Sequence, residues 1–356
     1  RQKQLLEDNN VKGYTMNEKE RLLRALRNEE VDRPPVVCPG GMMNMITTDL
    51  MKIAGVKWPE AHNDAQMMAN LSYASYKNGC FENVGLPFDM VAEAEQMGAK
   101  ITLGSEIFEP HVTSYAIESI HDWKSLKPMD MGEGRVKTIL DAIKILREMD
   151  KDVPIIGNIT GPISTASSVM EPTTFYKELR KHKADAHAYL DFVTEQLIDF
   201  AKAQIDAGVD VITVSDPSGT GEILGPKLFE EYTVKYLNKI YDEIKKYNVG
   251  TICHICGQMK SVYKEMNEVR SDALSFDSVV PMQQARKNLE DRVLMGNIST
   301  YALEFGDTER VSKLTRSAER SGTNIISPAC GLGTKSPIKN IKAILETVKE
   351  DSRANA

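Results

Sequence analysis

Residues 209–257, VDVITVSDPSGTGEILGPKLFEEYTVKYLNKIYDEIKKYNVGTICHICG, hold two apolar runs on either side of an amphipathic segment. The runs, Val209–Ser215 and Thr251–Cys256, are dominated by apolar and β-branched residues, as in strands buried on both faces. Between them, Lys227–Tyr247 has the apolar spacing of a helix. This strand, helix and strand predict a βαβ unit of a parallel sheet.

The same alternation continues on both sides of this unit. Six more strands are predicted at Pro35–Pro39, Phe88–Glu93, Val153–Asn158, Ala273–Asp277, Val293–Asn297 and Asn324–Pro328. More helices are predicted at Asn17–Glu30, with Asn17 as its N-cap, and at Pro172–Ala207, Gln258–Val269 and Thr308–Ser321. Eight strands alternating with helices favour an α/β (β/α)8 TIM barrel. The β-like segment Lys100–Tyr115 is expected to form a hairpin outside this barrel.

A doubly wound open sheet is the alternative fold. It would need a Gly-rich phosphate turn after its first strand, but Cys38-Pro39-Gly40-Gly41-Met42 lacks the G-x-G-x-x-G spacing. No Pro/Ser-rich linker divides the chain. We therefore expect a single barrel domain over residues 14–356, preceded by a polar helical N-terminal extension over residues 1–13.

Composition excludes several classes of protein. The 356 residues are 41% hydrophobic and 27% charged, as in ordinary globular proteins. The formal net charge is −7 and lysine and arginine do not cluster, so no nucleic-acid binding is expected. The sequence has no run of ~18 apolar residues, so no membrane span is predicted. Because RQKQLLEDNN at residues 1–10 also lacks a signal-peptide core, we expect a cytoplasmic protein.

The cysteines fit a reducing compartment. They are Cys38, Cys80, Cys253, Cys256 and Cys330. An odd, sparse set in a long chain is not a disulfide framework, so reduced thiols are predicted. For Cys38, Cys80 and Cys253 we favour the role of small buried apolar residues.

Polar residues recur where the predicted strands end. They are Cys38, Asn158, Asp216, His254, Cys256, Asp277, Asn297 and Cys330. The carboxyl ends of the strands form one rim of a (β/α)8 barrel, and active sites of this fold are built on that rim. The sequence therefore predicts a functional site there.

A metal site is predicted within this rim. Side chains alternate along a strand, so His254 and Cys256 in TICHICG point to one face, and Gly257 lets the backbone turn away. Cys330, in SPACGLG, ends a later strand. One histidine and two cysteines suit tetrahedral zinc with one open position, the mark of a catalytic site. Asp277 is either a fourth ligand or a carboxylate that orients His254.

Other rim residues are candidates for binding a substrate or cofactor. In the Gly-rich segment SDPSGTG, Asp216, Ser218 and Gly219 can bind an anionic tail or a large cofactor through backbone N–H groups. The alternative is ordinary turn chemistry, in which glycine supplies positive φ. Asn158 and Asn297 are further candidates of the same kind.

Several motifs together resemble a known family. They are ERLLRALRNEEVDRPPVVCPGGMMN, GNITGP, SDPSGTGEILGPKLFEEY, HICG, MGNIS and SPACGLGTKSP. From Glu18 to about Lys349 the chain resembles the uroporphyrinogen decarboxylase superfamily, and within it the methylcobamide:coenzyme M methyltransferase branch. The resemblance implies a (β/α)8 barrel, with zinc on His254, Cys256 and Cys330 as catalytic ligands. It also implies a small thiol substrate, and a methyl-corrinoid donor on a partner corrinoid protein.

Other activities stay open at this stage. Decarboxylases of this superfamily carry arginines after the first strand, whereas Cys38–Met45, CPGGMMNM, has none. Asp89, in Phe88-Asp89-Met90, resembles the decarboxylase segment with its key aspartate. A methyltransferase acting on homocysteine or tetrahydrofolate and a non-catalytic corrinoid-binding subunit are further alternatives.

Overall fold

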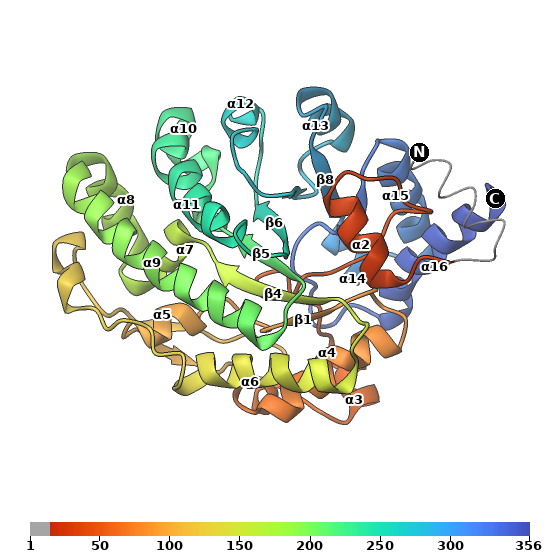
Figure 1. The fold of residues 1–356 in the computed structure, drawn as a ribbon, viewed down its shortest axis with the longest axis horizontal. Helices are drawn as coiled ribbons and strands as arrows, with labels where there is room; N and C mark the ends of the chain where they lie inside the picture. Colours follow the sequence, from red (N-terminus) through yellow and green to blue (C-terminus); the bar gives the residue numbers. More distant parts are fainter. Residues whose placement is uncertain (1–14) are drawn as a thin grey trace.

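The computed structural model describes residues 15–356, so the extension predicted for residues 1–13 lies outside the described residues. Seven parallel strands form one curled sheet in the order β1-β4-β5-β6-β7-β8-β9, with helices around it (Figure 1). They are β1 (Val84–Leu86), β4 (Ile155–Thr160), β5 (Val211–Ser215), β6 (Gly250–Ile255), β7 (Ala273–Phe276), β8 (Val293–Ile298) and β9 (Ile325–Pro328). The predicted strands other than the first two overlap these elements.

The predicted first strand, Pro35–Pro39, closes the sheet as a bridge rather than a regular strand. Val36 pairs in parallel with Ile326 of β9, and the Val37 N–H donates to the Ile326 carbonyl at 3.0 Å. On the other side, the Asn83 side chain bonds both the N–H and the carbonyl of Cys38, at 3.0 and 2.8 Å. Prolines in this segment remove ladder donors. The predicted (β/α)8 barrel fold is confirmed.

The strand predicted at Phe88–Glu93 is wrong. The regular strand lies upstream, at Val84–Leu86, and Pro87 follows it without a backbone donor. Beyond Pro87 the Asp89 carboxylate accepts the Val91 N–H at 3.1 Å, which turns the chain locally. The helix α5 (Ala92–Gln96) then begins.

Helices surround the sheet in the pattern that the alternation predicts (Figure 1). Those before the fifth strand of the chain are α2 (Glu18–Leu26), α3 (Thr48–Ala54), α4 (Ala65–Lys77), α5, α6 (Gly134–Met149), α7 (Pro162–Val169), α8 (Pro172–Lys181) and α9 (Lys183–Ala207). Those after it are α10 (Gly221–Leu228), α11 (Lys235–Ile244), α12 (Tyr263–Met266), α13 (Met282–Asn288), α14 (Thr300–Phe305), α15 (Thr308–Arg320) and α16 (Ile338–Ala354).

Two predicted helices are interrupted or shorter than expected. The segment Pro172–Ala207 divides at His182, whose backbone leaves helical geometry between α8 and α9. The segment Gln258–Val269 is helical only over α12, because the Gln258 N–H donates to the Glu222 side chain of α10 and the Gln258 amide donates to the Val279 carbonyl instead. The Asn17 cap is confirmed, since its side chain accepts the Glu20 N–H at 2.8 Å.

The excursion predicted at Lys100–Tyr115 is confirmed as a hairpin. Its strands β2 (Lys100–Thr102) and β3 (His111–Ser114) pair antiparallel, separate from the barrel sheet. The hairpin follows β1 and α5 in the chain, so it belongs to the segments above the carboxyl ends of the strands. It therefore contributes to the walls of the barrel mouth.

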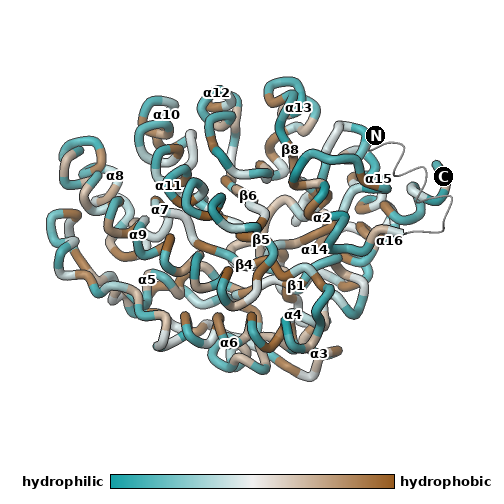
Figure 2. The backbone as a smooth tube through the Cα atoms, in the orientation of Figure 1, coloured by the Kyte–Doolittle hydropathy of each residue, from teal (hydrophilic) through white to brown (hydrophobic). Residues whose placement is uncertain are grey.

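The helix α2 covers the amino-terminal end of the barrel. Leu22 and Leu26 belong to the apolar cluster of the barrel interior, together with Ile156, Val211 and Ile252. A side chain on Gly250 would lie 2.6 Å from Leu26, so glycine at the start of β6 allows this close packing. Figure 2 shows hydrophobic stretches along the central strands and hydrophilic ones on outer helices such as α10. The amino-terminal end is thus closed, and access is left to the opposite rim.

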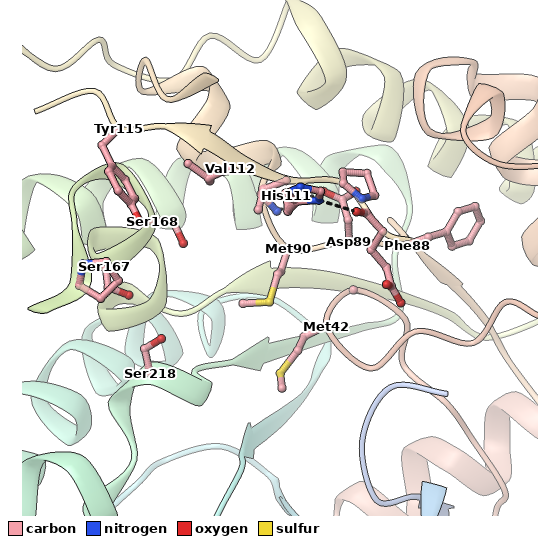
Figure 3. Close-up of a pocket in the computed structure, with 15 residues that line it drawn as sticks. Met42, Phe88, Asp89, Met90, His111, Val112, Tyr115, Ser167, Ser168 and Ser218 are labelled. Atoms are coloured by element: carbon pink, nitrogen blue, oxygen red, sulfur yellow. Dashed lines mark hydrogen bonds between the residues drawn. The ribbon is translucent and has the colours of Figure 1, made fainter. Parts of the chain in front are cut away.

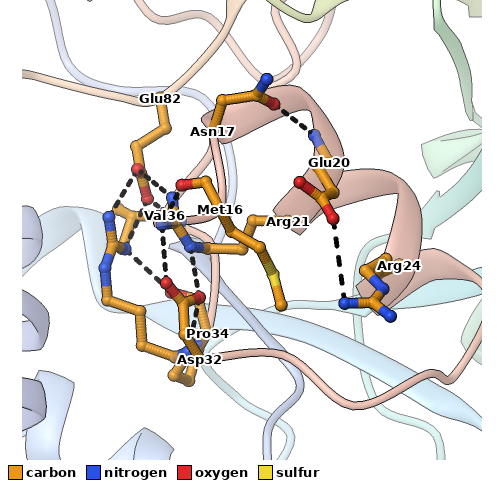
Figure 4. Close-up of polar contacts among 10 residues, drawn as sticks. Met16, Asn17, Glu20, Arg21, Arg24, Asp32, Pro34, Val36 and Glu82 are labelled. Carbon is orange, nitrogen blue, oxygen red and sulfur yellow. Dashed lines mark hydrogen bonds and ion pairs between the residues drawn. The ribbon is translucent and has the colours of Figure 1, made fainter. Parts of the chain in front are cut away.

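Buried charges fasten α2 to the barrel. The Arg21 guanidinium bonds Asp32 at 2.8 Å and Glu82 at 3.1 Å, and Arg33 bonds Glu82 at 2.7 Å (Figure 4). Arg21 and Glu82 are buried. Each charge therefore has a hydrogen-bonded counter-charge. Across residues 15–356, no helix combines the length and apolar character that crossing a membrane requires.

Candidate metal centre

Strand β6 alternates between the barrel interior and the surrounding helices. Ile252 belongs to the interior cluster with α2, whereas Cys253 and Ile255 belong to the cluster packed between sheet and helices. His254 therefore points inward, and its side chain is fully buried. Cys256 follows β6 directly, at the carboxyl end of the strand.

The structure brings together the three residues that the sequence predicted as metal ligands. His254 Nε2 lies 3.3 Å from Cys256 Sγ, and Cys256 Sγ lies 3.7 Å from Cys330 Sγ. The three ligand atoms all lie within 4.8 Å of one another. Cys256, Cys330 and the nearby Cys253 are free cysteines.

The loop after β9 reaches this cluster because glycine follows Cys330. A Cβ on Gly331 would lie 2.7 Å from the Met42 carbonyl oxygen and 3.1 Å from the Asn44 backbone nitrogen. Only a residue without a side chain allows the two loops to approach so closely. Leu332 continues the contact by donating its N–H to the Asn44 carbonyl at 2.8 Å. The Met42–Asn44 loop after the first strand thus supports the position of Cys330.

Ser275, which the sequence analysis did not single out, fixes the ring of His254. The two residues are register partners on β7 and β6, and Ser275 Oγ lies 2.9 Å from His254 Nδ1. With Nδ1 bonded to the hydroxyl, Nε2 is the nitrogen directed at Cys256. Histidines that bind metals are usually held in this way by a partner at the other nitrogen.

The thiols of the cluster differ electrostatically from the other cysteines. The hydrogen bond between them lowers the pKa of Cys330 well below that of a free thiol and raises the pKa of Cys256. By contrast, burial raises the pKa of Cys80 to about 11 and that of Cys253 to about 12. It also raises the pKa of Cys38.

Asp277 lies beside the cluster rather than in it. Its carboxylate accepts the N–H of Gly257 at 3.4 Å and that of Ser278 at 2.6 Å. The ring nitrogens of His254 already face Ser275 and Cys256, so Asp277 does not orient that histidine. It stabilises the turn in which the chain leaves Cys256.

Asp216 is buried and faces a helix. Its carboxylate accepts the N–H and the hydroxyl of Ser164, at 2.8 and 2.7 Å, and the N–H of Ile163 at 3.3 Å. These donors belong to the first turn of α7. Burial raises the pKa of Asp216 to about 6 although these bonds oppose the shift. Asp216 therefore positions α7 and the following turn.

Ser218 and Gly219 have different surroundings. Ser218 lines a cleft at the mouth, and its carbonyl accepts the Tyr176 hydroxyl at 2.8 Å. Gly219 packs closely against Thr233, since a Cβ there would lie 2.8 Å from Thr233 Oγ1. Of the residues predicted in this segment, Ser218 is the one open to a ligand.

The two predicted asparagines connect neighbouring loops of the rim. The Asn158 amide donates to the carbonyls of Pro39 and Leu86, at 2.8 and 2.9 Å. The Asn297 amide donates to the carbonyls of Asp277 and Val280, at 2.9 and 2.7 Å. Both side chains are thus engaged with backbone, and both hold the shape of the mouth.

A cleft of about 440 Å³ opens at the mouth of the barrel (Figure 3). Its walls come from the loops after the first strand, β1, β4 and β5, and from the hairpin strand β3. Met42 and Met90 face the same space, and Ser167, Ser168 and Ser218 line one side of it (Figure 3). Sequence reasoning did not identify this cleft, because its walls come from segments far apart in the chain.

Asp89 lies at this cleft but is held by a buried ion pair. Arg135 of α6 bonds both oxygens of the Asp89 carboxylate, and both side chains are buried. Among the described residues, no lysine or arginine lines the cleft. The cleft therefore has no lysine or arginine with which to pair the carboxylates of an acidic ligand.

The cluster fits a zinc ion by its chemistry. Two thiols and an imidazole are donors that zinc favours, and three protein ligands leave a fourth position open. His254 has the geometry of a metal ligand, because its Nδ1 faces the Ser275 hydroxyl and its Nε2 faces the thiols. A site of this kind can bind and polarise a small molecule at the open position.

Comparison with known proteins identifies the family of the chain and agrees with the fold. Residues 17–351 match the family described as uroporphyrinogen decarboxylase (URO-D). The chain is 35% identical to a methylcobamide:CoM methyltransferase, MtbA, of Methanosarcina acetivorans, over 93% of this chain and 97% of the relative. It is 32% identical to the methylcobamide:CoM methyltransferase MtaA of Methanosarcina barkeri, over 92% and 96%.

A solved structure is similar over nearly the whole length. It is described as a methyltransferase from Methanosarcina mazei, and it superposes with a TM-score of 0.88 at 29% identity. The superposition covers 94% of this chain and 99% of that one. The arrangement of strands and helices is therefore shared along the chain.

Proposed function

The chain belongs to the uroporphyrinogen decarboxylase family and to its methylcobamide:coenzyme M methyltransferase branch, and we propose that it is a zinc-dependent methyltransferase. In this proposal a methyl-corrinoid on a partner corrinoid protein is the donor, and a small thiol such as coenzyme M is the acceptor. The observation that carries the proposal is the cluster of His254, Cys256 and Cys330 at the barrel mouth. The proposal includes a cytoplasmic location, which the free cysteines support.

The three side chains of the cluster would hold the zinc. Bound there, zinc supplies an open coordination position and favours the thiolate form of a thiol substrate at neutral pH. Two cysteine thiolates and a neutral imidazole balance the charge of the ion, and that balance favours alkyl transfer to sulfur over hydrolysis. The surrounding residues hold these ligands in place.

The chain's own residues orient the cluster and its approach. Ser275 holds the His254 ring so that Nε2 faces the thiols. The contact between Gly331 and the Met42–Asn44 loop fixes the position of Cys330. The cleft opens on the same side, so donor and acceptor can be aligned over the cluster, which is the main task of the protein in a group transfer.

Decarboxylation of a porphyrinogen is disfavoured by the same geometry. Asp89 is the residue that resembled the key aspartate of decarboxylases, and here both of its oxygens are bonded to Arg135. The segment CPGGMMNM has no arginine, and among the described residues the cleft has no lysine or arginine. A polycarboxylated tetrapyrrole would enter without counter-charges.

Methyl transfer with purified components tests the proposal. The protein is mixed anaerobically with methylcobalamin and 2-mercaptoethanesulfonate, and the methylated thiol is measured by mass spectrometry. We expect turnover by wild type and loss of turnover in Cys330→Ala. The matched control is Cys253→Ala, a cysteine on the same strand region as Cys256 that faces the helices. Parallel reactions with homocysteine and tetrahydrofolate identify the acceptor.

A wild-type protein that holds zinc but methylates none of these acceptors would contradict the proposal. So would a Cys330→Ala variant with wild-type turnover, since the residue would then be outside the reacting site. Free methylcobalamin stands in for the protein-bound donor, so the assay does not depend on the partner. Transfer to a single acceptor would define the substrate class.

A further inference from the structure

We propose that Cys256 and Cys330 form a reversible oxidation site, in which a peroxide joins the two thiols as a disulfide and so removes them as metal ligands. The inference adds a modification to the site of the function proposed above, and it rests on that function only for the metal that is released. Three observations carry it: the separation of the two sulfur atoms, their exposure, and the burial of the other cysteines.

The two sulfur atoms are close enough to form a disulfide. Cys256 Sγ and Cys330 Sγ lie 3.7 Å apart, in van der Waals contact. A disulfide bond measures ~2.05 Å, so the two sulfurs must approach by less than ~2 Å. Two sulfurs bound at ~2.3 Å to one tetrahedral zinc lie ~3.8 Å apart. The observed separation therefore suits a shared metal, and a modest rotation of the side chains leads from it to the disulfide.

The backbone at both cysteines lies outside the strands. Cys256 follows the last residue of β6, and Cys330 is the second residue after β9. Each is followed by a glycine, Gly257 or Gly331, so no side chain of the next residue crowds the sulfurs. The approach of the two sulfur atoms therefore needs no change within the sheet.

Exposure distinguishes this pair from the other cysteines. Cys256 and Cys330 are half-buried, whereas Cys38, Cys80 and Cys253 are buried. An oxidant must contact a thiol in order to oxidise it, so the susceptibility of a cysteine follows its exposure. A small polar oxidant therefore reaches the sulfurs of Cys256 and Cys330 first.

The buried cysteines are also held in other contacts. Cys38 Sγ donates to the Met43 carbonyl at 3.2 Å. Cys253 belongs to the apolar cluster between sheet and helices, on the face of β6 opposite His254. Oxidation is therefore expected to give one defined product, the disulfide between Cys256 and Cys330.

The oxidation balances with hydrogen peroxide as the two-electron oxidant. One sulfur attacks a peroxide oxygen, the O–O bond breaks, and a sulfenic acid (S–OH) and one water form. The second sulfur displaces the hydroxyl group, so the S–S bond forms and a second water leaves. Two thiols and one peroxide thus give one disulfide and two waters. Where the sulfurs begin as thiolates, the solvent supplies the two protons.

The disulfide would switch the site off, because its sulfur atoms are no longer the thiolates that bind metals. Of the three clustered side chains, His254 alone then remains as a ligand. A dithiol reductant reverses the step: it exchanges with the disulfide, becomes oxidised itself and restores both thiols. The disulfide thus keeps the two cysteines from irreversible oxidation, and the reduced pair can bind metal again.

Peptide mapping after peroxide treatment tests the inference. The protein as isolated is treated anaerobically with one equivalent of hydrogen peroxide per chain, quenched with N-ethylmaleimide and digested with trypsin without reductant. Cys256 lies in the tryptic peptide of residues 247–260, and Cys330 lies in that of residues 321–335. The first peptide also contains Cys253, so Cys253→Ala is the matched variant that assigns the bond. Released zinc is measured in parallel with a chromophoric chelator.

We expect the two peptides to be cross-linked in most chains of wild type and of Cys253→Ala, with about one zinc released per disulfide. Dithiothreitol should cleave the cross-link, and added zinc should then rebind to the level of the untreated protein. A reversible cross-link between these peptides in both proteins supports the assigned site.

Several outcomes would overturn the inference. Wild-type peptides that stay separate, whether as free thiols or as sulfinic acids, would do so, and so would a cross-link from Cys330 to Cys38. Loss of the cross-link in Cys253→Ala would assign the bond to Cys253 instead. A cross-link in a wild type that holds no zinc would leave the oxidation site standing and refute the zinc-dependent function. Zinc-dependent methyl transfer without a cross-link would refute the oxidation site alone.

Discussion

Ser275 Oγ lies 2.9 Å from His254 Nδ1, across the register pair that joins strands β6 and β7. This bond leaves His254 Nε2 directed at the two thiols. It connects an ordinary sheet register to the orientation of a proposed metal ligand.

Replacing Ser275 by alanine should weaken zinc binding about 10–100-fold, the usual effect of losing the partner of a metal-binding histidine. Competition with a chromophoric chelator measures the affinity directly. Ser327→Ala is the matched control, because its buried hydroxyl bonds the Pro328 carbonyl and not the cluster. Equal zinc affinities of the two variants would show that the Ser275 bond does not hold the ligand.

Loss of the ion pairs that hold α2 should lower the stability of the protein and leave its metal content unchanged. Arg21→Met removes the bonds to Asp32 and Glu82 but leaves Glu82 paired with Arg33, so we expect a loss of about 3 kcal/mol in the free energy of unfolding. Urea unfolding measures this loss. Arg24→Met, at a more exposed pair with Glu20 at 3.8 Å, should lose less than ~1 kcal/mol. Similar losses in both variants would contradict the role of the buried pairs.

Glu93 should make stability depend on pH. Burial raises its pKa from 4.5 to about 7 although the Thr160 N–H, 2.5 Å away, favours the carboxylate. Between these values the folded state holds a proton that the unfolded state has lost, so this contribution to stability falls as pH rises from about 4.5 to about 7 and stays low above it.

Glu93→Gln keeps an acceptor for the Thr160 N–H and cannot ionise. Relative to wild type it should therefore be stabilised by about 3 kcal/mol at pH 8, with little difference near pH 4. Urea unfolding at the two pH values measures the change. The exposed Glu346 supplies the control variant Glu346→Gln, which should show no such pH dependence. If the stability gained by Glu93→Gln over wild type instead grew toward acid pH, the direction assigned to this pH dependence would be wrong.

The protein should not decarboxylate uroporphyrinogen. Arg135 engages both oxygens of Asp89, and among the described residues no lysine or arginine lines the cleft. Product analysis by chromatography after anaerobic incubation tests this expectation, with a uroporphyrinogen decarboxylase as positive control. Conversion at rates typical of an enzyme would show that carboxylates find counter-charges elsewhere in the mouth.

The sequence predicted the parts of the site that depend on local periodicity. Alternation along Thr251–Cys256 predicted that His254 and Cys253 lie on opposite faces of the strand, and the structure places His254 inside the barrel and Cys253 against the helices. Cys330 was predicted as a third ligand because it ends a later strand, but a strand pattern gives no distance between strand ends. The Gly331 contact with the Met42 loop determines that distance.

Features that depend on long-range packing were missed. Arg135 and Asp89 are 46 residues apart, and nothing in either segment alone indicates their ion pair. Pro87 and the bond from the Val91 N–H to the Asp89 carboxylate explain why Phe88–Glu93, whose apolar content resembles that of a strand, does not form one. Ser275 was within reach of sequence reasoning, since it has the inward parity of β7, but a serine in a strand has no signature of its own.

The most direct test of the account is the zinc content of the purified protein, measured by elemental analysis for wild type, Cys256→Ala and Cys253→Ala. The account predicts about one zinc per chain in wild type and in Cys253→Ala, and a large loss in Cys256→Ala, because a cluster reduced to one thiol and one imidazole binds zinc weakly. Wild-type zinc content in Cys256→Ala, or a wild type that binds no zinc, would contradict it.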